Sequence, residues 1–280
     1  MNTPAQYDKL CAEMADRVIS RYSTTFRLAV LVLHPRFRGA VRSIYAFVRL
    51  ADEIVDTFHD QDRDVLLERF RRDTGQALAE RFSLHPVLHH FQHTAHRYGI
   101  GAELIGPFLH SMAMDLERNF HDEHSFREYV HGSSEVVGLM CLKVFCAGDD
   151  AAYERLKAPA ARLGAAFQKV NFLRDLQDDR HALGRSYFPG VGSGQLDRKR
   201  MELLMREMEG DLEVARSGIR LLPRGARFGV YLAYAYNRAL LRRIGRSDPG
   251  QLHTHRIRLN EPAKMGLLAT SFLRYRLHLY

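Results

Sequence analysis

The chain has 280 residues, and 46% of them are hydrophobic, enough to bury a sizeable core in one large domain or two. Its 41 basic and 33 acidic side chains give a formal charge of +8, which suits an anionic ligand or an anionic membrane surface. The basic residues are spread along the chain instead of forming a run interleaved with aromatic residues, so we expect no nucleic-acid partner.

The cysteines and the N-terminus favour the cytoplasm. The three cysteines, Cys11, Cys141 and Cys146, form no C-x-x-C pair, as in a reducing compartment. The charged N-terminal segment does not have the composition of a signal or transit peptide. No apolar run approaches the roughly 20 residues of a membrane-spanning helix. We therefore expect a cytoplasmic protein, soluble or peripheral at the inner face of the membrane.

Apolar residues recur with helical spacing along the whole chain. Helices are predicted over 5–22, 26–33, 36–58 and 62–81 (peripheral), from Pro86, from Gly106-Pro107 to about Phe120, over 125–147, from a start or kink at Pro159 to near Gly184, over 195–221 and 226–245, and from about Glu261. A turn-rich loop is predicted over 185–194. No sustained alternation of apolar and polar residues and no repeat occurs. The chain is therefore predicted to be one all-α domain over residues 1–280.

The predicted helix over 36–58 carries a polar stripe among apolar residues. The stripe consists of Arg42, Tyr45, Arg49, Asp52 and Asp56, at spacings of three and four that place them on one helical face. A solvent-exposed face with an Arg–Asp pair is the alternative. The apolar residues on the other sides of the helix favour burial, and two acids one turn apart can both reach one metal cluster.

A second polar face lies on the predicted helix that ends near Gly184. It consists of Gln168, Asn171, Asp175 and Asp179, and the adjoining positions are apolar, so we expect this helix to be mostly buried. Asp178 is rotated away from this face. Buried acids need positive partners.

If the two acidic faces meet across a bundle, their four carboxylates need divalent cations or arginines as neighbours. Oxygen ligands suit Mg²⁺ or Mn²⁺ better than zinc, and Mg²⁺ prefers sites that substrate phosphates complete. Arg49 and Arg174 lie next to the acids and are placed to bind such phosphates. The surrounding apolar residues match a ligand with a diphosphate head and a long hydrocarbon tail.

Two further patterns are less specific. Small residues over 132–138 indicate either close helix packing or the wall of a cavity. His85, His89, His93 and His96 follow helical spacing, which could ligate zinc, but no carboxylate or cysteine partner is evident in that segment. A solvated histidine face is the favoured interpretation.

Several motifs together resemble the squalene/phytoene synthase family, and within it the bacterial phytoene synthases of carotenoid pathways. They are Tyr22-Ser23-Thr24-Thr25-Phe26, Arg42 to Tyr45, Arg49 to Asp56, Tyr129 to Gly138, Gln168 to Asp179, and Tyr187-Phe188-Pro189. They occur in order along nearly the whole chain and include both D-x-x-x-D motifs. The resemblance implies an all-α isoprenoid synthase bundle with a central cavity.

The resemblance also implies an activity. It is the Mg²⁺-dependent head-to-head (1′–1) condensation of two geranylgeranyl diphosphates to phytoene, through a cyclopropylcarbinyl diphosphate, by a prenyltransferase of the 15-cis-phytoene synthase type. Mn²⁺ is an alternative metal, no NADPH is expected, and downstream carotenoid enzymes are expected partners.

Residue roles follow from the resemblance, position by position. Asp52, Asp56, Asn171, Asp175 and Asp179 would bind metal. Tyr45, Tyr129, Tyr187 and Tyr236 would border the carbocation, which aromatic faces stabilise. Arg49, Arg174 and Arg256 would contact diphosphate, with Gln168 on the same face. The remaining substrate-binding positions, along the prenyl channel, would be Thr25, Phe26, Val30, Ser133, Val137 and Gly138.

One departure from the family concerns a diphosphate contact. Several members have a lysine where this chain has Thr24, and a histidine where it has Tyr22. Arg21 or Arg27 would have to point inward to replace the missing cation.

Two alternatives stay open. A squalene or dehydrosqualene synthase would use farnesyl diphosphate; reductive squalene formation also needs NADPH, for which no G-x-G-x-x-G signal occurs, and eukaryotic-type enzymes tend to carry a C-terminal anchor that we do not expect here. A non-catalytic assembly or lipid-binding factor would be expected to have eroded acid motifs. Separately, the apolar and basic composition from Lys264 to Tyr280 predicts transient contact with a membrane surface.

Overall fold

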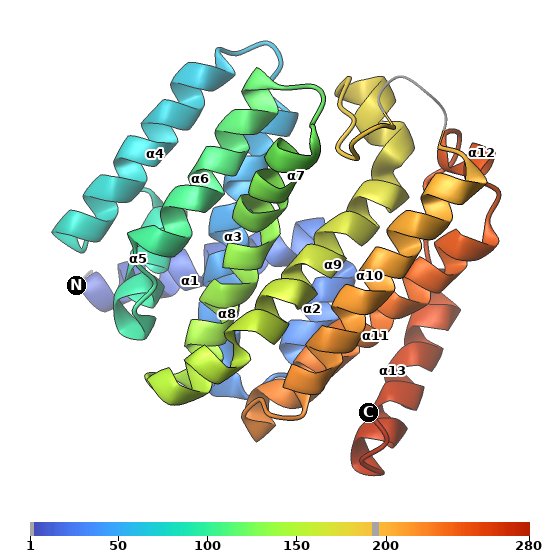
Figure 1. Cartoon of the computed structure of the whole chain (residues 1–280). Helices are drawn as coiled ribbons and strands as arrows, with labels where there is room; N and C mark the ends of the chain where they lie inside the picture. The colour runs from blue at the N-terminus through green and yellow to red at the C-terminus, as the bar shows by residue number, and fades with distance from the viewer. Residues whose placement is uncertain (1–2, 192–195) are drawn as a thin grey trace.

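The computed structural model describes residues 3–191 and 196–280, and the regular structure among them is helical, which confirms the all-α class. The helices are α1 (Pro4–Tyr22), α2 (Thr24–Leu31), α3 (Pro35–Asp56), α4 (Arg63–Glu80), α5 (Pro86–Tyr98), α6 (Ala102–Glu117), α7 (Glu123–Val130), the π-helix η1 (His131–Glu135), α8 (Val136–Cys146), α9 (Asp150–Ala182), α10 (Arg198–Ile219), α11 (Arg224–Arg246), α12 (Pro249–Leu252) and α13 (Glu261–Arg276). Most of the long helices run side by side in a bundle, with α4 and α13 at opposite edges (Figure 1).

Side-chain caps explain where several helices begin. The side chains of Ser23, Asp62, Asp149, Asp197 and Asn260 each accept a hydrogen bond from a backbone N–H two or three residues into the helix. Proline occupies the first turn of α1, α3 and α5, where its missing N–H has no intrahelical partner to lose.

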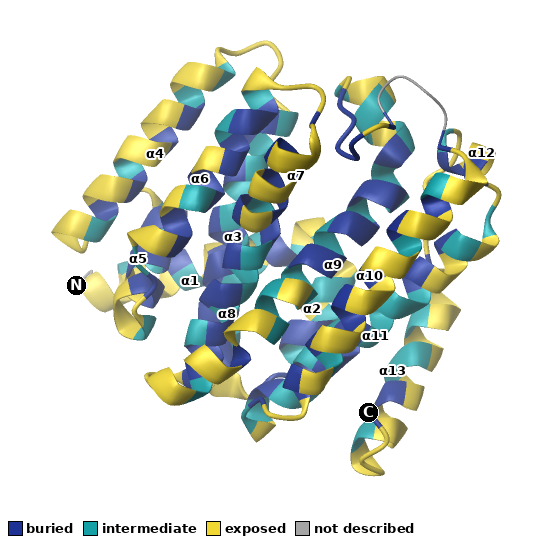
Figure 2. Ribbon diagram, viewed as in Figure 1, coloured by how far each residue is buried: buried dark blue, intermediate teal, exposed yellow. Residues whose placement is uncertain are grey.

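The two acidic helices lie in the middle of the core. On α3, Phe47 is fully buried and stacks on Phe91 of α5 with ring centroids 3.9 Å apart. On α9, Val170 and Leu173 are fully buried against α10 residues such as Met208. Each such side chain contributes about 1.5–3 kcal/mol by leaving water. Figure 2 shows the buried residues concentrated on α3, α8 and α9, so the predicted burial of both acidic helices is confirmed.

Some predicted boundaries were wrong. Helix α6 begins at Ala102 and continues through Gly106-Pro107, although an interior proline costs about 3 kcal/mol. Packing of α6 against η1 accounts for this continuation, because the Pro107 carbonyl lies against Gly132. The segment 125–147 contains η1 between two α-helices, and Pro159 lies inside α9, which begins earlier, at Asp150. The predicted loop over 185–194 is described only as far as Val191.

Glycines allow η1 and α8 to approach their neighbours closely. A Cβ added at Gly132 would lie 2.3 Å from the Pro107 carbonyl oxygen, and one at Gly138 would lie 2.9 Å from the Ala160 carbonyl oxygen. Both distances are too short for a side chain. Close helix packing therefore applies to both glycines.

None of the described helices combines the length and apolar composition that crossing a bilayer requires.

Candidate active site

The bundle encloses a cavity of about 590 Å³ that has a polar part and an apolar part. Its lining follows α9 from Leu156 to Asp175, which corresponds to about 28 Å at 1.5 Å per residue. Near Asp175 the wall carries acids, arginines and amides. Near Leu156 it is formed by apolar side chains such as Leu142 and Phe145 of α8. The cavity can therefore hold a long ligand with a charged head and a hydrocarbon tail.

Most of the predicted site residues line this one cavity. They are Thr25, Phe26, Val30, Tyr45, Arg49, Asp52, Tyr129, Ser133, Val137, Gly138, Gln168, Asn171, Arg174, Asp175, Tyr236 and Arg256. Gly138 therefore serves both helix packing and the cavity wall. Asp56, Asp179 and Tyr187 are absent from the described lining, and Asp56 and Tyr187 belong to a hydrogen-bond network described below.

Arginines lie against the acids at the polar part of the cavity. Arg256 Nε is 2.6 Å from Asp175 Oδ1, and Arg174 Nε donates to the same oxygen over 2.8 Å. Arg49 pairs with Glu53 on α3, and its Nη1 is 4.0 Å from Asp52 Oδ2. The cations that line the cavity are thus already held beside the carboxylates.

Two buried polar atoms in the cavity wall have no hydrogen-bond partner. They are Arg49 Nε and Ser133 Oγ. An unpaired buried donor costs about 1–3 kcal/mol unless a ligand or water satisfies it.

The acids of the two helices disfavour one another's ionisation. Burial raises the pKa of Asp52 to about 7, and the nearby charge of Asp56 adds to this shift. Burial also raises the pKa of Asp179 to about 8, with further contributions from the charges of Asp175 and Asp56. Asp56 on α3 therefore acts on acids of both helices. A cation bound here would remove this repulsion.

The donor set fits magnesium. The carboxylates of Asp52 and Asp175 and the amide of Asn171, which line the same cavity, supply the oxygen ligands that Mg²⁺ and Mn²⁺ prefer. Among the described residues, no three acids of this site bring their ligand atoms within 4.8 Å of one another. The protein thus supplies no complete cage, as is usual for Mg²⁺ sites that substrate phosphates and water complete.

Sequence reasoning missed a hydrogen-bond network that includes one of the acids. Arg185 donates to Asp56 Oδ1 over 2.6 Å and to the Val55 carbonyl over 2.9 Å. Asp115 of α6 accepts hydrogen bonds from the hydroxyls of Tyr129 (2.7 Å) and Tyr187 (2.9 Å). Burial raises the pKa of Asp115 to about 6, against the opposing effect of the Arg185 charge. The network fixes two of the predicted tyrosines and one predicted acid.

A sequence signal for Asp115 did exist. It is a single acid in the apolar run Met112-Ala113-Met114-Asp115-Leu116, and a buried acid requires polar partners. Arg185 lies in a segment read only as a loop, without periodicity, and its partners are distant in sequence. It had no comparable signal.

The missing family lysine is not replaced by a neighbouring arginine. Arg21 and Arg27 are both exposed, and neither lines the cavity. Instead, the Tyr22 ring lies under the Arg49 guanidinium, 4.4 Å from its carbon to the ring centroid. The positive charges in the described lining are Arg49, Arg174 and Arg256.

The predicted solvated histidine face is wrong for His89. This residue is buried, whereas His85, His93 and His96 are exposed. The partner that the sequence did not reveal is Asp8 of α1, whose Oδ1 lies 2.9 Å from His89 Nε2 and 3.4 Å from His93 Nε2.

The same cluster has ligand atoms close enough to hold a metal ion. However, the Ser83 N–H donates to His89 Nδ1 over 3.2 Å. This bond leaves Nε2 to carry the ring proton and to donate to Asp8, whereas a metal-bound Nε2 would need the proton on Nδ1. The cluster is therefore a hydrogen-bonded link between α1 and α5.

Comparison with solved structures supports the fold. The structure superposes on a dehydrosqualene synthase solved with a ligand, with a TM-score of 0.83 and 21% identity over 99% of this chain and 100% of that chain. It also superposes on a squalene synthase from Alicyclobacillus acidocaldarius, with a TM-score of 0.74 and 23% identity over 88% and 98% of the two chains.

Sequence comparison identifies the family. The chain is 27% identical over 270 residues to a 15-cis-phytoene synthase from Paracoccus sp., which covers 89% of this chain and 87% of that protein. It is 27% identical over 169 residues to a presqualene diphosphate synthase from Rhodopseudomonas palustris, or 59% and 58% of the two chains. Residues 19–262 match the family described as squalene/phytoene synthase. This chain therefore belongs to the squalene/phytoene synthase family.

Proposed function

We propose that the chain condenses two geranylgeranyl diphosphates head to head (1′–1) to phytoene, through a cyclopropylcarbinyl diphosphate. One observation carries the proposal: a single cavity joins Asp52 and Asp175 of the two acid motifs, three arginines and a long apolar wall. This combination suits substrates that pair a diphosphate with a long prenyl chain. Kinship with a phytoene synthase over most of both chains favours the C20 substrate.

In this proposal the polar part of the cavity handles the leaving group. Arg49, Arg174 and Arg256 bind diphosphate oxygens, because all three guanidinium side chains line this cavity. Asp52, Asp56, Asp175 and Asp179, with Asn171, hold the metal. Mg²⁺, or Mn²⁺ in its place, supplies the positive charge that stabilises the departing diphosphate.

The aromatic residues guide the chemistry at carbon. Tyr45 stacks on Phe26 with ring centroids 5.3 Å apart, so both rings are held at the cavity wall. Asp115 accepts hydrogen bonds from the hydroxyls of Tyr129 and Tyr187. The Tyr129 ring lines the cavity, where it can stabilise a nearby carbocation, whereas the Tyr187 ring lies outside the described lining and stacks on Phe172 with ring centroids 4.1 Å apart. Burial and the Asp115 charge raise the pKa of both tyrosines well above 10, so both stay neutral hydroxyls. Proton loss from the final cation completes the reaction, and we expect turnover without NADPH.

The product identifies the substrate. Purified chain is incubated with Mg²⁺ and either geranylgeranyl or farnesyl diphosphate, with and without NADPH, and the hydrocarbon is identified by mass. We expect a C40 hydrocarbon from geranylgeranyl diphosphate without NADPH. Efficient formation of a C30 product or of presqualene diphosphate from farnesyl diphosphate instead would establish the alternative substrate, which the presqualene diphosphate synthase relative favours.

A non-catalytic assembly or lipid-binding role is the remaining alternative. Both acid motifs are intact, and their residues contact the arginines described above. Absence of Mg²⁺-dependent diphosphate release from either donor would support that role and refute the enzymatic proposal.

A further inference from the structure

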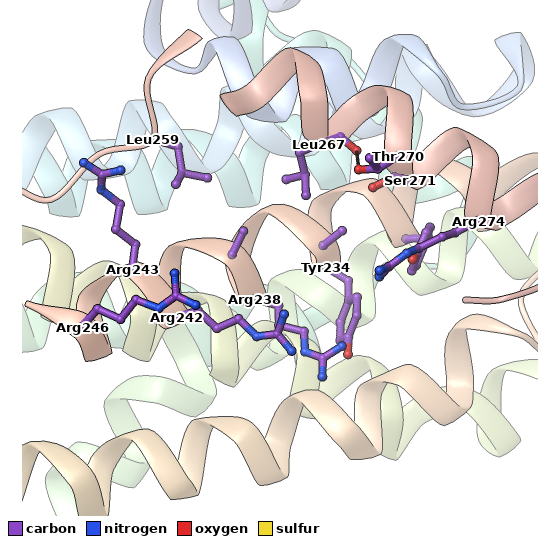
Figure 3. A pocket seen from close by; sticks show the side chains of 13 residues that line it. Tyr234, Arg238, Arg242, Arg243, Arg246, Leu259, Leu267, Thr270, Ser271 and Arg274 are labelled. Atoms are coloured by element: carbon purple, nitrogen blue, oxygen red, sulfur yellow. Dashed lines mark hydrogen bonds between the residues drawn. The ribbon is translucent and has the colours of Figure 1, made fainter. Parts of the chain in front are cut away.

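A second cavity, of about 450 Å³, lies between α11 and α13, outside the proposed active site. Five arginines line it: Arg238, Arg242, Arg243 and Arg246 from α11, and Arg274 from α13. Figure 3 shows Arg238, Arg242 and Arg246 following one another along α11, with Arg274 reaching in from α13. None of the described residues that line this cavity is acidic. The proposed function uses none of these side chains.

The five guanidinium groups have no partner in the described part of the chain. None of them takes part in an ion pair or a side-chain hydrogen bond, although most other buried or clustered arginines of the protein do. Glu213 of α10 acts on the neighbouring Tyr234, but it pairs with Arg216 at 3.5 Å. Arg238 is half-buried and the other four arginines are exposed, so solvent screens part of their mutual repulsion, and an anion lying between them would reduce the rest.

The spacing makes this cavity a groove suited to phosphate. Residues 238, 242 and 246 are each about one turn apart on α11, and the small side chains of Ala235 and Ala239 also line the groove and leave room beside the arginines. From α13, Thr270 and the buried Ser271 line the opposite side, and the Thr270 hydroxyl already donates to the Gly266 carbonyl over 2.8 Å. The guanidinium groups are therefore the donors, and planar guanidinium groups form a common binding site for phosphoryl oxygens.

The outer edge of the groove is apolar and exposed. Leu273 and Leu277 are 59% and 65% exposed, and helical spacing places them beside Thr270 and Arg274 on α13. An apolar edge next to clustered arginines matches the boundary of a membrane, where acyl chains begin below charged phosphates. A soluble phosphate has no apolar part that could contact this edge.

We propose that the groove between α11 and α13 binds the phosphate of an anionic phospholipid, with Leu273 and Leu277 entering the membrane interface beside it. The protein would then rest on an anionic membrane through its C-terminal helix. This proposal stands apart from the proposed catalytic function, because the groove and the catalytic cavity share no lining residue.

The test is flotation of the full chain with vesicles of phosphatidylcholine alone or mixed with phosphatidylglycerol. We expect binding to the anionic vesicles and a loss of about thirtyfold in the double variant R242Q/R246Q, for two arginines at a membrane surface. The matched control is R69Q/R71Q on α4, which removes the same charge from two exposed arginines without ion pairs. The control should bind like wild type, and L273S/L277S should bind more weakly.

Thermal unfolding midpoints of the variants test whether they fold. We expect midpoints near that of wild type, because the Arg242 and Arg246 side chains have no described partner to lose. Equal binding to neutral and anionic vesicles, wild-type binding by R242Q/R246Q, or an equal loss in R69Q/R71Q would overturn the proposal. Calorimetric titration with inorganic diphosphate tests whether the groove binds a soluble anion instead of a lipid phosphate. Heat that R242Q/R246Q abolishes, together with vesicle binding that this variant retains, would assign the groove to a soluble anion and refute the lipid.

Discussion

Arg185 Nη1 lies 2.6 Å from Asp56 Oδ1 and so ties the segment that follows α9 to the end of α3. The same guanidinium donates to the Val55 carbonyl, and its Nη1 is 3.5 Å from Asp115 Oδ1. One buried cation thus connects the two acid-bearing helices with α6. The relative position of the two acid motifs depends on this residue.

Replacing Arg185 should therefore destabilise the fold. Its side chain is only 4% exposed, and R185Q leaves Asp115 buried without its cation, for which we expect a loss of about 3–5 kcal/mol in the free energy of unfolding. Urea denaturation measures this loss. The control is R72Q, which breaks an exposed pair with Asp73 and should change stability by less than about 0.5 kcal/mol. Equal stability of R185Q and wild type would show that the network is not structural.

Asp175 should be essential for turnover, because it lies at the meeting point of Arg174, Arg256 and the proposed metal. We expect D175N to lower kcat at least about 10²-fold while the chain stays folded. The neighbouring D178N is the matched control. Asp178 is half exposed, and its contact with Arg256 is longer, at 3.6 Å. Its replacement should therefore lower kcat less than about tenfold. Product formation is followed by mass, and near-normal turnover by D175N would contradict its assignment.

The stability of the metal-free protein should depend on pH with a definite sign. The pKa values of Asp52 (about 7) and Asp179 (about 8) lie above the ordinary 3.8, so these two carboxyl groups bind more protons in the folded chain than in the unfolded chain between about pH 4 and 8. Each raised pKa therefore makes the free energy of unfolding rise as the pH falls through this window, by at most about 1.4 kcal/mol per pH unit.

Urea unfolding in EDTA at about pH 6 and pH 8 measures this dependence. The double variant D52N/D179N should show a smaller slope than wild type, because the remaining titrating groups are common to both proteins. Added Mg²⁺ should stabilise wild type more at the higher pH, where the acids are ionised. Identical slopes in the two proteins would refute the assignment of the raised pKa values.

Gly132 should tolerate no side chain. The Cβ of G132A would lie 2.3 Å from the Pro107 carbonyl oxygen and 2.8 Å from Ser111 Cβ, and we expect a loss of about 1–3 kcal/mol in unfolding free energy. G39A on α3 is the control, since nothing lies within 4 Å of its added Cβ. Its stability should be unchanged or higher by up to about 1 kcal/mol. Thermal or urea unfolding distinguishes the two variants.

The parts of the fold that follow from helical periodicity were predictable. Asp52 and Asp175 were placed on polar faces of buried helices, and both line the same cavity. Periodicity is a local property, and it failed where a distant partner decides the outcome. His89 can be buried because Asp8, 81 residues earlier, accepts a hydrogen bond from its ring N–H. The continuation of α6 through Pro107 likewise depends on its contact with η1, which no local pattern in the sequence indicates.

The arginine–acid contacts at the polar part of the cavity imply an exchange of partners during binding. Arg174 and Arg256 both hold Asp175, and Arg49 holds acids of α3. A metal ion that binds Asp175 would release the guanidinium groups to bind diphosphate. A diphosphate that binds the guanidinium groups would likewise release the Asp175 carboxylate to bind metal. Each arrival thus lowers the cost of the other, so metal and substrate should load cooperatively, with reciprocal gains in affinity. The arginines and carboxylates of the site thus occupy, for one another, the positions that diphosphate and metal would take.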